Sequence, residues 1–111
     1  MEHTITEDGS LTVISLEGEI DLEYSSQVRE ILLGTFGENN RAIIVDLSGV
    51  LMIDSSGVAS LLEGFQSAKK RGKEFILAGP GESVLRVLKL ARLDTVFTLA
   101  DDVDSAKSAA G

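Results

Sequence analysis

The stretch DLSGVLMIDSSGV, from Asp46 to Val58, joins the end of a predicted strand to the start of a predicted helix. Apolar residues then recur at helical spacing, and the helix should end near Arg71: they are Val58, Leu61, Leu62 and Phe65. Asp54 or Ser55 is the expected N-cap, because Asp and Ser oxygens accept hydrogen bonds from the amides of a first helical turn. A hydroxyl here lies near unpaired N–H groups and the positive end of the helix dipole, so a phosphate on Ser55 would be stabilised. An ordinary capped helix explains the same residues, and the two roles are compatible.

The remaining pattern alternates between strands and helices. A hairpin is expected first, with strands at 3–6 and 11–16 around an Asp-Gly turn. A helix closed by Gly37 follows, and buried strands are expected at 42–45 and 75–78. After a turn at 79–81, the sequence predicts a short helix at 84–91 and a fraying helical tail at 105–111. The sequence therefore predicts one α/β domain over residues 1–111, with a largely parallel sheet of four to five strands, about four helices and an antiparallel opening hairpin.

Composition describes an ordinary soluble domain. The chain has 111 residues, of which 43% are hydrophobic and 25% charged, and it has no cysteine. Its net charge of −8 disfavours nucleic acid and anionic membranes as partners and favours a basic protein surface. We find no leader-like or membrane-spanning apolar segment, so we expect a cytoplasmic protein. We expect a monomer or a weak dimer.

Three blocks of the sequence resemble the STAS family, the sulfate transporter and anti-sigma factor antagonist domain. The stretch from Asp46 to Val58 is similar to the family signature D-L-S-x-V-x-x-I-D-S-S-G-L, and Leu16 to Leu22 resembles L-x-G-E-L-D-L. A weaker third block, Leu93 to Phe97 followed by Asp102 to Ala106, resembles the closing strand and final helix. Single-domain members resembling this chain act as anti-sigma factor antagonists. The resemblance implies that an anti-sigma factor serine kinase phosphorylates Ser55 and thereby releases the protein, and that a phosphatase reverses this.

The resemblance and the predicted fold together suggest a partner-binding surface at one edge of the sheet. We expect Ser55 to be the phosphorylated residue, with Ser56 as second choice, and Gly57 to leave clearance for the partner. If nothing approaches its backbone, Gly57→Ala should leave stability unchanged or slightly raised. The expected partner-binding residues are Glu19, Asp21, Asp46, Leu47, Ser48, Asp54, Ser56 and Gly57. A turn and an N-cap for a helix beginning near Leu22 explain Glu19 and Asp21 equally well.

Other functions have less support. We expect no enzymatic activity, metal or cofactor, because His3 is the only histidine, no G-x-S-x-G elbow occurs, and the glycine-rich 79–83 segment lacks a P-loop lysine. A STAS domain that serves only as a scaffold or transport-complex subunit, with Ser55 never phosphorylated, remains an alternative. A second alternative is a receiver-like domain phosphorylated on Asp46, with Glu19 and Asp21 as its metal-binding acids, although the expected lysine is missing.

Overall fold

Five strands form one mixed sheet in the computed structural model, which describes residues 2–37 and 39–110. The strands lie in the order β1-β2-β3-β4-β5; β1 and β2 are antiparallel, and the remaining neighbours are parallel. Their bounds are Glu2–Asp8, Leu11–Ile20, Ala42–Ile53, Glu74–Ala78 and Thr98–Ala100. The predicted fold class and the opening hairpin are therefore confirmed.

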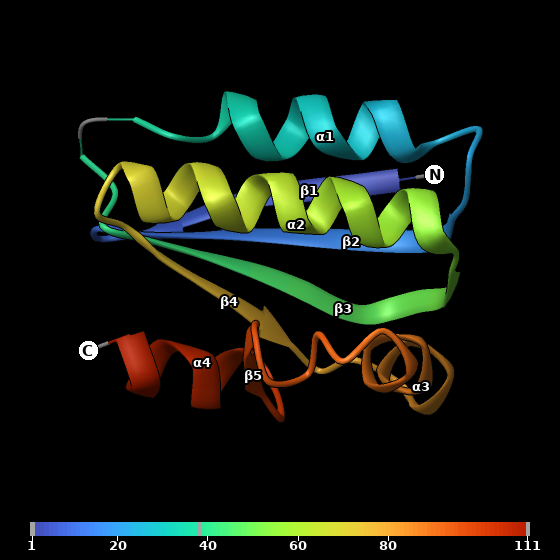
Figure 1. The fold of residues 1–111 in the computed structure, drawn as a ribbon. Coiled ribbons are helices and arrows are strands. Elements are labelled where there is room, and N and C mark those ends of the chain that lie inside the picture. The colour runs from blue at the N-terminus through green and yellow to red at the C-terminus, as the bar shows by residue number, and fades with distance from the viewer. Residues whose placement is uncertain (1, 38, 111) are drawn as a thin grey trace.

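Four helices cover the two faces of this sheet. They are α1 (Ser25–Gly34), α2 (Ser55–Lys70), α3 (Glu82–Leu90) and α4 (Val103–Ala110). In Figure 1, α1 and α2 lie above the sheet, and α3 and α4 lie below it. The central strands are consequently buried on both sides, which is why they read as continuous apolar runs instead of alternating patterns.

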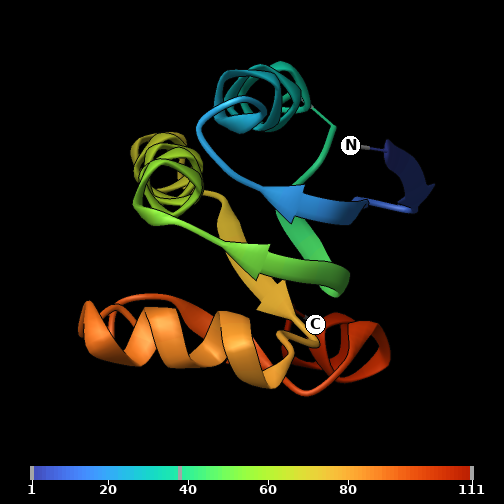
Figure 2. The ribbon, with the colours of Figure 1, turned by 90° about the vertical axis from the view of Figure 1, so that its right-hand side faces the viewer.

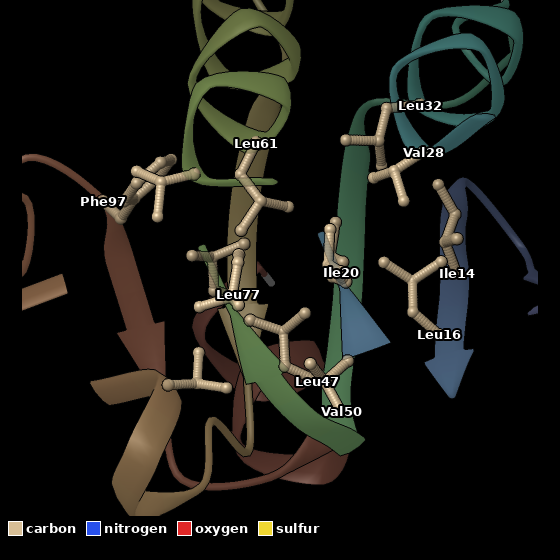
Figure 3. Packing of buried hydrophobic residues seen from close by; sticks show 14 of the residues in the cluster. Ile14, Leu16, Ile20, Val28, Leu32, Leu47, Val50, Leu61, Leu77 and Phe97 are labelled. Carbon is tan, nitrogen blue, oxygen red and sulfur yellow. The ribbon is translucent and has the colours of Figure 1, made fainter. Parts of the chain in front are cut away.

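Alternate residues of the central strands supply two separate apolar clusters. In β2, Ile14 and Leu16 point to the larger cluster beneath α1 and α2, whereas Leu11 and Val13 point to the α4 side. Figure 3 shows the larger cluster, in which Leu61 and other side chains pack between helices and sheet. The fold thus fixes the start of α2 firmly against the ends of β2 and β3.

The third strand is longer than the sequence indicated. It was expected to stop at Val45, but β3 has 12 residues and ends at Ile53. The partner strand β2 is long as well and ends at Ile20. The ladder between β2 and β3 has two register shifts, one between Ser15 and Glu17 and one between Gly18 and Glu19, and Gly18 has a φ of 106°. Leu47 and Ser48 therefore lie within the strand, and Asp54 is the residue that follows its end.

Three smaller expectations about element ends are wrong. Thr35, not Gly37, is the C-cap of α1. The segment 93–97 is a turn that leads into β5 instead of forming the strand itself. The last helix begins at Val103 and not at Ser105, and it packs on the sheet through the small buried residues Ala106 and Ala110; Gly111 lies outside the described residues.

Candidate functional site

Asp54 caps α2 and joins it to the loop between β2 and α1. Its Oδ1 accepts hydrogen bonds from the N–H groups of Ser56 at 3.0 Å and Gly57 at 3.1 Å. Its Oδ2 accepts the N–H of Leu22 at 3.1 Å, and its own N–H donates to the Ile20 carbonyl at 3.1 Å. Figure 2 faces this end of the molecule, where β2 and β3 end and α1 and α2 begin. Of the two candidate caps, the structure therefore selects Asp54.

These hydrogen bonds also determine the charge of Asp54. The Ser56 hydroxyl donates to Oδ1 at 2.6 Å and contributes most to holding the pKa of Asp54 below its ordinary value of 3.8. The N–H groups of Gly57, Ser56 and Leu22 lower the pKa further, because each stabilises the ionised form. Asp54 is thus a fixed negative charge at neutral pH.

The two serines after Asp54 have different surroundings. Ser55 is the first residue of α2 and its side chain is exposed. The hydroxyl of Ser56 is partly buried and is held by the Asp54 carboxylate. Ser55 therefore has the more accessible hydroxyl, and it does not serve as the cap. Two of the first-turn amides are paired with Asp54, so the helix dipole remains as the main stabilisation of an anion at Ser55.

Gly57 has an intramolecular reason to be glycine. It is buried, and a Cβ at this position would lie 2.6 Å from Cγ2 of Ile20, 2.7 Å from Cγ1 of Ile53 and 2.8 Å from the carbonyl oxygen of Ile20. The condition for alanine to change stability little, that nothing approaches the Gly57 backbone, is therefore wrong, because the missing side chain makes room for β2 and β3.

Two further predicted residues lie close to Asp54. Glu19 is exposed on β2 and pairs in register with Met52 of β3. Asp21 accepts hydrogen bonds at Oδ1 from the N–H groups of Glu23 at 3.0 Å and Tyr24 at 3.3 Å, which stabilises the turn before α1. Asp21 thus has the turn role that the sequence allowed, next to the start of α2. The N-cap role is wrong for both acids, because α1 begins at Ser25 after Tyr24, without a side-chain cap, and Glu19 lies within β2.

The remaining predicted residues do not join this group. Leu47 is fully buried in the core, so it cannot contact a partner directly. Asp46 accepts hydrogen bonds at Oδ1 from the N–H of Ser48 at 3.0 Å and from its hydroxyl at 2.7 Å, beside Gly79 on the α4 side of the sheet. The extended chain from Asp46 to Asp54 spans roughly 25 Å. The expectation that all the predicted residues meet at one edge is wrong, because β3 is longer than predicted.

The same placement contradicts the receiver-like alternative. Asp46 pairs in register with Ser15, whereas Glu19 pairs with Met52 at the far end of the strand, so the acids do not converge. A receiver domain has the parallel strand order 2-1-3-4-5. This chain has the order 1-2-3-4-5 with an antiparallel first pair.

The exposure of three large apolar side chains at this end of the sheet was not predicted. Leu22 is 77% exposed, Leu51 71% and Met52 43%. The N–H of Leu22 donates to Asp54, and Leu51 and Met52 precede Asp54 at the end of β3. The four consecutive apolar residues before Asp54 could have indicated this exposure, because the end of a strand cannot bury side chains on every side. We call Leu22, Leu51, Met52, Asp54 and Ser55 the Ser55 surface.

Comparison with known proteins gives a consistent result. The STAS domain family matches residues 3–106. The chain is similar to the anti-sigma-F factor antagonist RsfB of Mycobacterium tuberculosis, with 29% identity over 98 residues, covering 86% of this chain and 78% of RsfB. No helix among residues 2–37 and 39–110 has both the length and the apolar character needed to span a bilayer.

Solved structures share the fold. An anti-sigma factor antagonist from Mycobacterium paratuberculosis has a TM-score of 0.89 at 24% identity, covering 98% of this chain and 92% of that one. The Bacillus cell fate determinant SpoIIAA in its phosphorylated form has a TM-score of 0.74 at 21% identity, covering 97% of this chain and 98% of that one. Because the family match extends over nearly the whole sequence and the fold agrees, this chain belongs to the STAS domain family.

Proposed function

We propose that this protein is an anti-sigma factor antagonist, which binds an anti-sigma factor serine kinase through the Ser55 surface and is released when Ser55 is phosphorylated. The observation that carries the proposal is the separation of two tasks at the start of α2. Asp54 caps the helix, whereas Ser55 beside it is exposed and takes no part in the cap. A phosphate can therefore be added to Ser55 without breaking the cap that holds α2 to β2. The name of the relative RsfB supports the same role.

The unmodified surface suits a protein partner. Three exposed apolar side chains at this end of the sheet offer area to bury, and the fixed charge of Asp54 lies beside one of these residues, Leu22. Binding of this kind sequesters the anti-sigma factor and frees the sigma factor. No catalytic step is assigned to the chain itself.

Phosphorylation changes this surface by charge. It adds about −1.5 to −2 charges and three acceptor oxygens at Ser55, next to the ionised Asp54. A partner that has buried the neighbouring leucines must then desolvate two adjacent anions, which strongly opposes binding. The helix dipole offsets part of the repulsion within the fold, so the domain stays folded while affinity falls. A phosphatase restores the binding form in the cytoplasm.

The test begins by capturing the kinase from lysate with the unmodified protein and identifying it by mass spectrometry. Incubation with the kinase and ATP should place phosphate on Ser55, and Ser56→Ala should still be labelled whereas Ser55→Ala should not. Label on Ser56 or Asp46 would contradict the assignment. Recovery of membrane-transport subunits, together with an unlabelled Ser55, would favour the scaffold alternative.

Two substitutions test the release step. Ser55→Asp adds a carboxylate at the positive end of α2, a placement worth about 0.3–1 kcal/mol and partly opposed by Asp54, so the protein should stay folded while kinase binding drops sharply. Ser55→Ala should bind constitutively in the presence of ATP. If Ser55→Asp bound as tightly as the parent, charge at this position would not be the cause of release.

A further inference from the structure

The first strand, β1, is an edge strand with every side chain exposed. It pairs with β2 through a regular ladder from Glu2↔Glu17 to Asp8↔Leu11, and its other edge lies at the end of the strand order. None of its seven residues is buried. Figure 2 shows β1 at the side of the molecule, apart from the helices. Such an edge presents a row of N–H and C=O groups that can pair with another strand.

Of the features that commonly prevent edge pairing, the strand has only charged residues: Glu2, Glu7 and Asp8, which lie toward its ends. Its sequence EHTITED contains no proline and no lysine. The ladder between β1 and β2 runs without a register shift, so no bulge bends the free edge away. A straight edge strand of this kind accepts another strand with little rearrangement.

We propose that two copies of this chain associate through antiparallel β1–β1 pairing centred on Ile5, joining two five-stranded sheets into one. In a two-fold symmetric antiparallel pair, one residue must lie opposite its own copy. Ile5 is the middle residue of the strand, so this register pairs its full length. Thr4 then lies opposite Thr6 of the second copy, and His3 opposite Glu7 of the second copy.

This register is complementary to itself. The half-exposed Ile5 side chains meet on the symmetry axis, and on each side an imidazole faces a carboxylate and two threonines face each other. Cross-strand pairs of these types stabilise antiparallel sheets. At the ends, Glu2 faces Asp8 of the second copy, but Lys107 Nζ already lies 3.1 Å from Asp8 Oδ2 and reduces that repulsion. Registers centred on Thr4 or Thr6 shorten the pairing and place Ile5 opposite a polar residue.

The rest of the fold leaves room for the pair. Two β1 strands separate the β2 strands of the two copies by about 14 Å, which exceeds the usual 8–10 Å between packed helices, so the two α1 helices do not collide. Antiparallel pairing also places the two Ser55 surfaces at opposite ends of the dimer, where both remain accessible. The dimer therefore does not depend on the proposed function. A single strand pair buries little area, so we expect a dissociation constant of roughly 10–500 µM.

Cysteine cross-linking tests the register, because the chain has no cysteine of its own. Ile5→Cys places one thiol on the axis, where opposite Cα atoms lie about 4.5–5.5 Å apart, within the range of a disulfide. Mild oxidation should give a covalent dimer of Ile5→Cys much faster than of Leu90→Cys, a control site that is 80% exposed and lies on α3. Thr4→Cys and Thr6→Cys should cross-link quickly only when the two proteins are mixed. Equal rates for Ile5→Cys and Leu90→Cys would overturn the proposal, and rapid cross-linking of Thr4→Cys alone would overturn the register.

Sedimentation velocity tests the unmodified dimer. The parent should show a concentration-dependent rise in sedimentation coefficient, which Ile5→Lys should abolish and Leu90→Lys should retain. Circular dichroism verifies that both variants are folded, as their exposed positions allow. A parent that stays monomeric at millimolar concentration, or an Ile5→Lys variant that dimerises like the parent, would show that β1 is not the contact.

Discussion

Replacing Gly57 by alanine tests how tightly α2 is held against the sheet. The added Cβ would lie 2.6 Å from Ile20 Cγ2 and 2.7 Å from Ile53 Cγ1, distances that real Cβ atoms essentially never show. Both atoms are bonded directly to the Cβ of a buried isoleucine, so a small side-chain rotation does not relieve the contacts. The third contact, 2.8 Å to the Ile20 carbonyl oxygen, involves backbone that also accepts the Asp54 N–H. Either β2 or the first turn of α2 must therefore move.

The size of the effect follows from two opposing contributions. Overpacking a well-filled core costs about 1–3 kcal/mol, and replacing glycine by alanine within a helix returns about 0.5–1 kcal/mol. We expect Gly57→Ala to lower the free energy of unfolding by about 1–2 kcal/mol. For a domain of this size, that corresponds to a fall in Tm of roughly 5–10 °C.

Urea unfolding followed by circular dichroism measures the change, and Gly34→Ala is the matched control. Gly34 also lies in a helix, but a Cβ there would meet nothing within 4 Å. The control should therefore be unchanged or more stable by up to about 1 kcal/mol, with the same m-value as the parent. If Gly57→Ala proved as stable as the parent, the packing argument would fail and Gly57 would be free to serve the partner alone.

Three further results are expected. Asp54→Asn should make the free energy of unfolding depend less on pH in acid. The lowered pKa of Asp54 contributes stability that is complete above pH 3.8, declines as the pH falls toward the folded-state pKa and is absent below it. Urea titrations on both sides of pH 3.8 measure this, and equal losses of stability in parent and variant would contradict it. Leu51→Lys, at a 71% exposed position, should change the unfolding free energy by less than about 0.5 kcal/mol yet weaken kinase binding by roughly tenfold or more, as measured by calorimetric titration. Ser56→Ala should lower the urea midpoint through loss of the 2.6 Å bond to Asp54, whereas Ser55→Ala, which removes no cap, should leave it unchanged.

The parts of the fold that depend on local pattern could be predicted from the sequence. The Asp-Gly turn gave the hairpin, the branched run at 42–45 gave a central strand, and the spacing after Asp54 gave α2 to within one residue of its observed end at Lys70. Apolar periodicity and turn residues suffice for such elements, because their cause lies within a few positions of chain.

Features caused by distant contacts could not be predicted. Two of the three contacts that require glycine at position 57 come from Ile20 on β2, which is 37 residues away in the sequence. The separation of Asp46 from Ser55 depends on how far β3 continues, which its pairing with an equally extended β2 determines. The exposure of Leu51 depends on where β3 ends; the apolar run before Asp54 indicated that some of its side chains are exposed, but not which ones.

The pairing of Asp54 with two amides of α2 also bears on how a phosphate would be removed. Where the amides of a helix start are unpaired, an anion settles among the N–H groups and is retained. Here the N–H groups of Ser56 and Gly57 are already occupied. A phosphate on exposed Ser55 would extend into water, and a phosphatase could bind its oxygens without unfolding the first turn of α2. In the proposed switch, the lifetime of the phosphorylated form would then depend on the phosphatase and not on protection of the phosphate by the fold.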